Sequence, residues 1–261
     1  MRKVMIAVCF FVSASAFAAS MSDTYVVPVA GHVRGANGET WVTDVTLHNP
    51  NGAPLLVELS AVGANGAALD VDPAVVTLPA RGTTTLRDVL HRASGLGALV
   101  AVADEAFALT SRVYTAGARG SVGQSVAAMN EFADAERPDA FLTGLASNDS
   151  YRTNIGFFAV ADAAPLQIEV ALFDANGATL GTRTFTIAAG TMTQLQVSSR
   201  DIAPVSFDAA TARVRVVAGD GLVTSYASLV DNHSSDGSFI AASVVDGGAP
   251  LSLLRSRVVV R

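Results

Sequence analysis

The stretch Trp41-Val-Thr-Asp-Val-Thr-Leu-His-Asn-Pro50 decides the fold, because it returns later in the chain as Tyr151-Arg-Thr-Asn-Ile-Gly-Phe-Phe-Ala159. In both copies an aromatic residue, a threonine and two apolar residues occupy every second position. Period-two spacing places these four side chains on one face of a β-strand. Each copy is followed by alanine, proline and leucine, at Ala53-Pro54-Leu55 and Ala164-Pro165-Leu166. We therefore predict two copies of one β domain.

The turn signals follow the same order in both halves. The turn Ala64-Asn65-Gly66-Ala67 recurs as Ala175-Asn176-Gly177-Ala178, and within predicted strands Thr110-Ser111 recurs as Thr224-Ser225. Gly, Pro, Asn and Asp punctuate short alternating runs and predict seven or eight strands per copy, which is typical of a β-sandwich. A parallel α/β fold would need helical stretches between the strands, and we find none. The predicted class is all-β, with two tandem antiparallel β-sandwich domains related by an internal repeat.

Three local predictions concern individual strands. Thr24–His32 alternates around its valines and is predicted as a first strand. Ala98–Ala103 and Phe107–Thr115 are predicted as two strands around a turn at Asp104-Glu105. Gly219-Asp-Gly221 is predicted as the turn of a β-hairpin, because Gly and Asp favour tight turns.

The N-terminus has the pattern of a secretory signal peptide. Arg2 and Lys3 precede the apolar run Val4–Val12, and Ala16-Phe17-Ala18 is a small-x-small cleavage site. We therefore expect a secreted, periplasmic or cell-surface protein. No later apolar stretch is long enough to span a membrane without polar or glycine interruption. The alternative to a cleaved signal peptide is an N-terminal anchor helix.

The predicted domain boundaries follow from these segments. A charged stretch containing a proline separates the two copies, and an apolar, arginine-bearing tail follows the second copy. The boundaries are 1–18 for the signal peptide, 24–130 for the first sandwich, 131–139 for the linker, 140–248 for the second sandwich and 249–261 for the tail. We expect the tail to add as a strand to a sheet edge, with a frayed end as the alternative.

The composition excludes several classes of protein. Hydrophobic residues make up 50% and charged residues 15%, which fits an ordered core and argues against disorder. The formal net charge is −6 and Lys3 is the only lysine, so an acidic chain without basic runs is a poor nucleic-acid binder. Cys9 is the only cysteine and lies in the leader. The mature chain therefore has no disulfide, and its stability must come from core burial.

The repeated frame resembles the immunoglobulin-like domains of bacterial secreted proteins, whose functions are generally uncharacterised. The frame is an aromatic-x-Thr-Asp/Asn strand, an Asn-Pro and small-Pro loop, a strand, and an Asn-Gly turn. The second copy departs from it, with Val160-Ala161 in place of Asn49-Pro50. The resemblance implies immunoglobulin-like sandwiches but no specific function. Periplasmic pilus chaperones share the two-domain architecture, but they anchor a carboxylate with an Arg–Lys pair and the mature chain has no lysine.

One segment carries a weak metal-site pattern. Asp231, Asn232, Ser234 and Asp236 place oxygen-bearing side chains close together before a glycine, as in half of a calcium loop. The bidentate glutamate of such a loop is missing, and the same residues are common at hairpin tips. We expect a turn here and predict no cofactor.

No catalytic constellation is evident from the sequence. The four histidines have no metal-binding spacing, and Gly120-Ser121-Val122-Gly123 lacks the glycine two residues before the serine that a nucleophile elbow requires. Trp41 and Tyr151 share a face with aliphatic residues, so we interpret them as core residues, with a sugar-stacking platform as the alternative. Asp44 and Asn154 occupy matched positions on the opposite face, where a local bond from the side chain to the backbone is expected and a shared ligand is the alternative.

The predicted function is therefore non-catalytic. We expect a secreted or cell-envelope interaction or structural protein that binds a protein or an envelope component through loops or an edge strand. A carbohydrate-binding or enzyme-accessory module is the alternative, and a periplasmic chaperone-like role has weaker support. Nucleic acid is not an expected partner, and no transmembrane segment is expected once the signal peptide is removed.

Overall fold

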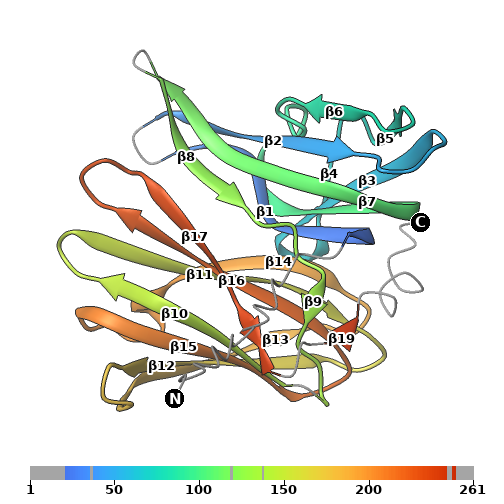
Figure 1. The fold of residues 1–261 in the computed structure, drawn as a ribbon. Helices are drawn as coiled ribbons and strands as arrows, with labels where there is room; N and C mark the ends of the chain where they lie inside the picture. The colour runs from blue at the N-terminus through green and yellow to red at the C-terminus, as the bar shows by residue number, and fades with distance from the viewer. Residues whose placement is uncertain (1–20, 36–37, 118–119, 137, 246–248, 251–261) are drawn as a thin grey trace, which may run out of the picture.

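The computed structural model describes residues 21–35, 38–117, 120–136, 138–245 and 249–250. The predicted signal peptide and most of the predicted tail lie outside these residues. The described regular structure consists of strands and two short 3₁₀ turns, at Ala64–Gly66 and Ser199–Asp201. Neighbouring strands pair antiparallel throughout the described part of the chain (Figure 1). The predicted all-β antiparallel class is confirmed, and it fits a β-sandwich architecture. No helix of the described residues is long and apolar enough to cross a membrane.

The first half forms two layers of sheet. An outer sheet has the order β6-β2-β7-β8, and an inner sheet has the order β4-β3-β7-β1, with β5 paired to β3. The strands are β1 Ser22–Arg34, β2 Thr40–His48, β3 Leu55–Gly63, β4 Ala68–Leu69, β5 Val75–Leu78, β6 Thr83–Leu86, β7 Gly95–Gly117 and β8 Gly120–Val126.

The strand β7 belongs to both layers, which corrects the prediction of two strands around a turn. It runs without reversal for 23 residues, pairing first with β1 and β3 and then with β2 and β8. Asp104 and Glu105 are exposed and lie opposite a register shift in β1 between Ser22 and Thr24. A bulge of this kind bends and twists a strand, so the chain crosses from one sheet to the other instead of turning back.

The second half also forms two sheets. The sheet that faces the first half has the order β14-β11-β16-β17, and the far sheet has the order β13-β12-β15-β10-β18. The strands are β10 Asp139–Ser147, β11 Tyr151–Ala161, β12 Leu166–Asp174, β13 Thr179–Ile187, β14 Met192–Ser198, β15 Phe207–Ala218, β16 Gly221–Asp231, β17 Gly237–Ala241 and β18 Ser243–Val244.

The turn at Gly219–Gly221 does not close a hairpin, contrary to the prediction. It joins β15 to β16, which lie in different sheets with different partners. The glycines allow a short step between layers, since Gly219 has a positive φ of 94°. In the first half, the continuous strand β7 makes the same step without a break.

The predicted linker 131–139 is packed against the second half. Strand β9, Glu131–Phe132, pairs with β19, Ala249–Pro250, and Ala133 bridges to Val223. Phe132 is fully buried. The chain between the halves is therefore held by backbone pairing and by one aromatic anchor.

The order of strands differs from that of the immunoglobulin fold. Immunoglobulin sandwiches pair their first strand with the second and their last strand with the sixth. Here β10, the first main strand of the second half, pairs with β15, the sixth, and β16, the seventh, pairs with β11, the second. The resemblance therefore holds for the sandwich architecture and not for the strand order.

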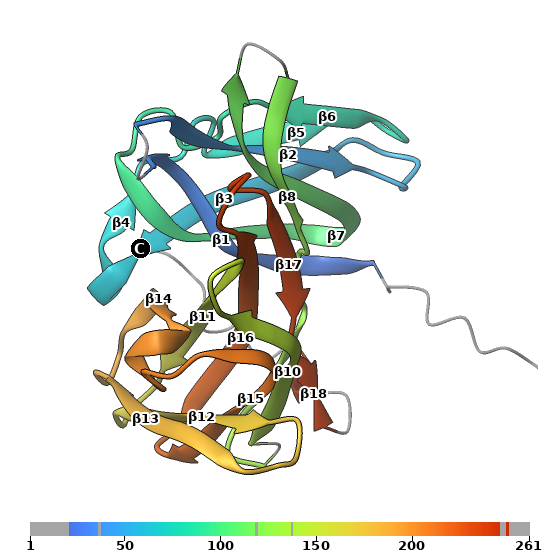
Figure 2. The ribbon, with the colours of Figure 1, turned by 90° about the vertical axis from the view of Figure 1, so that its left-hand side faces the viewer.

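The two halves stack as four layers of sheet (Figures 1 and 2). Each half has its own apolar core, and a third cluster lies where the inner sheet of the first half meets β11 and β16. This interface cluster consists of Val26, Val62, Ala98, Val100, Phe132, Phe158, Val160 and Leu222. The predicted alternation of Thr24–His32 is consequently absent, because β1 is buried on both faces between these layers.

Candidate functional site

The threonines of both motif copies lie in the core, whereas the two motif aromatics are not both buried. Thr43 and Thr153 are fully buried. Thr43 Oγ1 accepts from the Gly31 amide at 2.7 Å and donates to the Gly31 carbonyl at 3.0 Å. Thr153 makes the same two bonds to Ala146, at 3.3 and 2.6 Å. Each threonine side chain thus supplies the two hydrogen bonds that the backbone of a neighbouring strand would otherwise make, at the point where the first strand of the half separates from the second.

The two motif aromatics have different surroundings. Trp41 is half-buried and packs against the first core, whereas Tyr151 is 40% exposed, so its prediction as a core residue is wrong. Tyr151 lies opposite Asp231 at the end of the β11–β16 ladder, beyond the part of the sheet that another layer covers. Period-two spacing identified the buried face correctly but could not show where that face ends.

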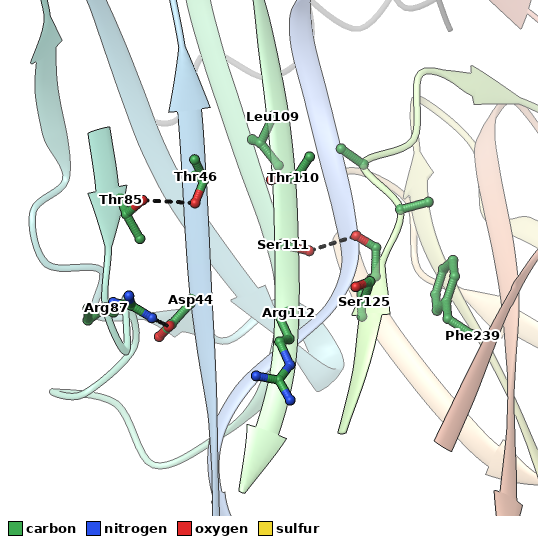
Figure 3. A pocket seen from close by; sticks show the side chains of 13 residues that line it. Asp44, Thr46, Thr85, Arg87, Leu109, Thr110, Ser111, Arg112, Ser125 and Phe239 are labelled. Atoms are coloured by element: carbon green, nitrogen blue, oxygen red, sulfur yellow. Dashed lines mark hydrogen bonds and ion pairs between the residues drawn. The ribbon is translucent and has the colours of Figure 1, made fainter. Parts of the chain in front are cut away.

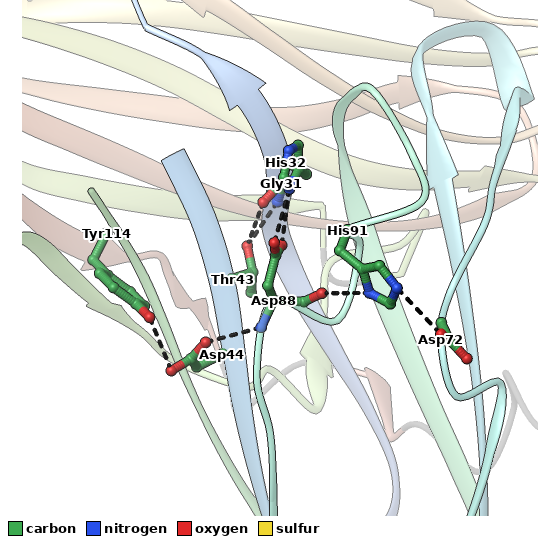
Figure 4. Close-up of polar contacts among 8 residues, drawn as sticks. All are labelled: Gly31, His32, Thr43, Asp44, Asp72, Asp88, His91 and Tyr114. Carbon is green, nitrogen blue, oxygen red and sulfur yellow. Dashed lines mark hydrogen bonds and ion pairs between the residues drawn. The ribbon is translucent and has the colours of Figure 1, made fainter. Parts of the chain in front are cut away.

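Asp44 is the centre of a polar network in the outer sheet (Figure 4). Its carboxylate accepts hydrogen bonds from Arg87 Nη1, from the Asp88 amide at 3.0 Å and from the Tyr114 hydroxyl at 3.3 Å. Asp44 therefore bonds a backbone amide that lies 44 residues away in sequence, instead of the local backbone group that was predicted. The hydrogen bond from Arg87 and the charge of Asp44 raise the pKa of the Arg87 guanidinium.

Two histidine–aspartate pairs lie beside this network (Figure 4). His32 Nδ1 lies 2.9 Å from Asp88 Oδ2, and His91 Nε2 lies 3.2 Å from Asp72 Oδ2. A catalytic triad also needs a hydroxyl or thiol on the other ring nitrogen. Within the described residues, the second nitrogen of His32 has no such partner, and Nδ1 of His91 bonds the Asp88 carbonyl. The His32–Asp88 pair joins strand β1 to a loop and the His91–Asp72 pair joins two loops, so the geometry fits a structural role.

A hollow of about 540 Å³ lies over the outer face of the outer sheet, and Phe239 of β17 in the second half also lines it (Figure 3). We call it the outer hollow. Its floor has two rows of side chains: the first runs across β6, β2 and β7, and the second crosses β2 and β7 and begins at Arg87, the residue after β6. The first row is Thr85, Thr46 and Thr110, and Thr46 Oγ1 lies 3.0 Å from Thr85 Oγ1. These hydroxyls can both donate and accept hydrogen bonds.

The second row of the outer hollow carries its charges. It runs from Arg87 through Asp44 to Arg112, which lies opposite Ser125 on β8. Asp44 pairs with Arg87, whereas Arg112 has no carboxylate partner within the described part of the chain. The Arg112 guanidinium lies 4.8 Å from the Tyr114 ring centroid, and Nη2 donates to Ser121 Oγ at 2.8 Å. The row therefore presents one positioned cation without a counter-charge.

The four weak metal candidates form a turn. Asp231 Oδ1 accepts from the amides of His233 and Ser234, and these bonds, that of Ser234 first, lower the pKa of the Asp231 carboxyl. Asn232 bonds Arg152 and the loop after β10, and Ser234 Oγ accepts from the Asp236 amide. In the described ranges, no group of three His, Cys, Asp or Glu side chains is placed to hold a metal ion.

Of the residues that line the outer hollow, only Asp44 was a candidate from the sequence, and Thr110 and Ser111 were named only as part of the repeat. The available signal is alternation: Thr83, Thr85 and Arg87 alternate with residues that face the core. Gly120–Gly123, which lacks part of the nucleophile-elbow pattern, forms the start of strand β8, and Ser121 Oγ accepts a hydrogen bond from Arg112.

No protein-family model matches the chain, and no curated protein matches it. Among solved structures, the apo form of the Pleurotus ostreatus lectin is similar over 87% of this chain and 76% of that chain, with 12% identity and a TM-score of 0.20. The same lectin in complex with GalNAc covers 87% and 85%, with 11% identity and a TM-score of 0.19. A glycosyl hydrolase family 2 member from Bacteroides cellulosilyticus DSM 14838 covers 80% and 28%, with 9% identity and a TM-score of 0.18. Likenesses at these TM-scores support no conclusion about function.

Proposed function

We propose that this chain is a non-catalytic binding protein, secreted or held at the cell envelope, whose outer hollow recognises a carboxylate-bearing component of that envelope. The observation that carries this proposal is the row Arg87–Asp44–Arg112 with its neighbouring threonine row. The hollow lies on the sheet face between the edge strands β6 and β8, so the proposed contact is made by this face instead of by a strand edge or a loop.

The chemistry of Arg112 favours a carboxylate ligand. A guanidinium presents a planar set of donors that matches a carboxylate with two parallel hydrogen bonds. Stacking on Tyr114 and the bond to Ser121 restrict the Arg112 side chain before a ligand arrives, which reduces the entropy lost on binding. Threonine and serine hydroxyls beside it would bond the remaining oxygens of a hydroxyl-rich polymer.

The proposal includes an architecture of two β-sandwiches related by an internal repeat. Strand pairing supports it: the pairs β1–β7, β3–β7, β3–β5, β2–β6, β2–β7 and β7–β8 recur as β10–β15, β12–β15, β12–β13, β11–β14, β11–β16 and β16–β17. The matched hydrogen bonds of Thr43 and Thr153 support it further. Thr46 and Gly156 hold matched positions, so the sheet face that forms the outer hollow in one copy is covered by the other half in the second.

The test is binding of polygalacturonate, a carboxylated polysaccharide, with neutral dextran as the control polymer. We expect binding of polygalacturonate that weakens with added salt, because screening reduces contacts between exposed charges. Arg112→Gln should weaken this binding about tenfold, corresponding to about 1.4 kcal/mol for a charge-assisted hydrogen bond.

The matched control is Arg183→Gln, which removes the same charge from the distant strand β13, where Arg183 lies over Phe185. It should leave binding unchanged. Equal losses in the two variants would show non-specific charge attraction, and equal binding of dextran would show that the carboxylate is not recognised. Either result would overturn the proposed ligand.

A further inference from the structure

A second cavity lies between the two halves, and none of its lining residues lines the outer hollow. It has a volume of about 350 Å³, within the range of about 300–1,000 Å³ found for small-molecule sites. Such sites occur preferentially where two structural units meet. We call it the central cleft. Trp41 lines it from the first half and Asn154 from the second, so both copies of the repeated motif contribute to it.

The two sides of the central cleft differ in chemistry. Val29, Val33, Leu96 and Val113 give the first half an apolar surface, and Trp41 adds the only indole of the chain. The Trp41 Nε1 group donates to Glu39 Oε1 at 3.2 Å, which fixes the orientation of the ring. This side offers a flat aromatic group beside aliphatic side chains.

Amide and hydroxyl groups gather around this apolar surface. Asn154, Gln196 and Ser228 come from the second half, and Gln124 comes from β8. Gln196 Oε1 accepts a hydrogen bond from the Tyr226 hydroxyl, and Ser228 Oγ donates a hydrogen bond to Gln124 Oε1. These bonds hold the side chains of Gln196, Ser228 and Gln124 in place. The Asn154 side chain makes no hydrogen bond to any other described residue. An amide in this position can donate to and accept from one ligand at the same time.

We propose that the central cleft binds a neutral saccharide, with the apolar C–H face of a sugar ring on Trp41 and its hydroxyls on the amides. A pyranose has this same division into an apolar face and a hydroxyl edge. Neutral sugar fits better than a charged ligand, because the cleft contains one carboxylate, Glu39, and one guanidinium, Arg152, already bonded to Asn232. This site is separate from the outer hollow and does not depend on a carboxylate ligand there.

Trp41 is the only tryptophan, so its fluorescence reports on this cleft directly. The test titrates the full chain with neutral mono- and disaccharides built from hexoses and N-acetylhexosamines. We expect at least one of them to give a saturable change in emission and to protect the indole from acrylamide quenching. Calorimetry with Trp41→Phe, which lacks the signal, should show weakened binding of the same sugar.

Two variants separate this site from the outer hollow. Asn154→Ala should weaken sugar binding about tenfold, as expected for the loss of one or two hydrogen bonds. Arg112→Gln should leave sugar binding unchanged, although it weakens polygalacturonate binding. The proposal is wrong if no sugar of the panel gives a saturable change, or if Asn154→Ala, folded by circular dichroism, binds as tightly as the parent chain. Failure of polygalacturonate binding alone would not affect it.

Discussion

At the scale of single residues, Thr43 and Thr153 are the side chains through which the motif acts. Valine has nearly the same shape but no hydroxyl, so Thr43→Val would leave the amide and carbonyl of Gly31 without their buried partner. A buried polar group without a partner costs about 1–3 kcal/mol. We expect Thr43→Val and Thr153→Val each to lower the free energy of unfolding by about this amount in urea titrations.

The control for these variants is Thr110→Val, which removes an exposed hydroxyl from the outer hollow. Surface substitutions of this kind usually change stability by about 0.5 kcal/mol or less. If Thr43→Val were no more destabilising than Thr110→Val, the proposed role of the buried threonines would be wrong.

Asp139 should make stability depend on pH in the acid range. Its carboxylate accepts two bonds from Arg215, at 2.6 and 2.7 Å, and these bonds lower its pKa below the ordinary value of 3.8. A carboxyl group whose pKa is lower in the folded chain than in the unfolded chain stabilises the fold fully above pH 3.8. This contribution is lost as the pH falls through the pKa of the folded state. We therefore expect Asp139→Asn to destabilise the chain at pH 7, and the difference from the parent to shrink below pH 3.8.

Urea titrations at pH 7 and at several acid pH values measure this difference. Arg215→Met removes the donor, so Asp139→Asn in that background should have a smaller effect with little dependence on pH. A difference that stays constant through the acid range would rule out this assignment.

At the scale of elements, the packing between β11 and β16 requires glycine at position 156, which has no side chain. Gly156 faces the fully buried ring of Tyr226, and a Cβ at Gly156 would collide with that ring. The Tyr226 hydroxyl is held by Gln194 and Gln196, and burial raises its pKa. We expect Gly156→Ala to lower the free energy of unfolding by about 1–3 kcal/mol, the usual cost of overpacking.

Gly52→Ala is the matched control for Gly156→Ala. A Cβ at Gly52 would meet no atom within 4 Å, so this variant should have the stability of the parent chain. Thermal unfolding followed by circular dichroism compares the two. Equal melting temperatures for both variants would show that Tyr226 has room to move.

Strand positions could be predicted from the sequence, but their partners could not. Alternation located β2 and β11 within about two residues, because one face of each strand meets a core. The continuity of β7 could not be seen, since exposed Asp104 and Glu105 are typical of a turn and of a bulge alike. The burial of both faces of β11 could have been predicted from the unbroken apolar run Ile155–Ala161. A search for alternating apolar and polar residues does not detect such a run.

At the scale of the whole molecule, the interface between the halves has an apolar core of its own. Phe158 and Leu222 pack against Val26 and Val100. We expect residues 21–130 and 131–250, produced as two chains in one cell, to co-purify, because each alone would expose this apolar surface to water. Phe158→Asp should abolish co-purification, since it would bury an unpaired charge.

Tyr151→Asp is the control for co-purification, because Tyr151 is exposed and lies outside the interface cluster. It should leave the complex intact. Two halves that stay folded and apart at high concentration would show that the interface contributes little. Circular dichroism of each purified half distinguishes that result from simple failure to fold.

The candidate sites depend on this stacking, which limits how far they could be predicted. Trp41 and Asn154 were singled out from the sequence, yet their meeting in the central cleft depends on which sheet faces which. Arg112 gave no signal, because an arginine in a strand is ordinary on any exposed face. Cross-strand register, which no local pattern determines here, brings it beside Asp44.

The continuous strand β7 also determines how the protein would respond to mechanical tension. Its 23 residues extend over about 75 Å at roughly 3.3 Å each. A force along this strand loads the ladders to β1, β3, β2 and β8 in shear, so many hydrogen bonds must break together. In the second half the corresponding path is divided at Gly219–Gly221, and β15 and β16 can separate one after the other. Under a force applied along these strands, we expect the second half to extend before the first.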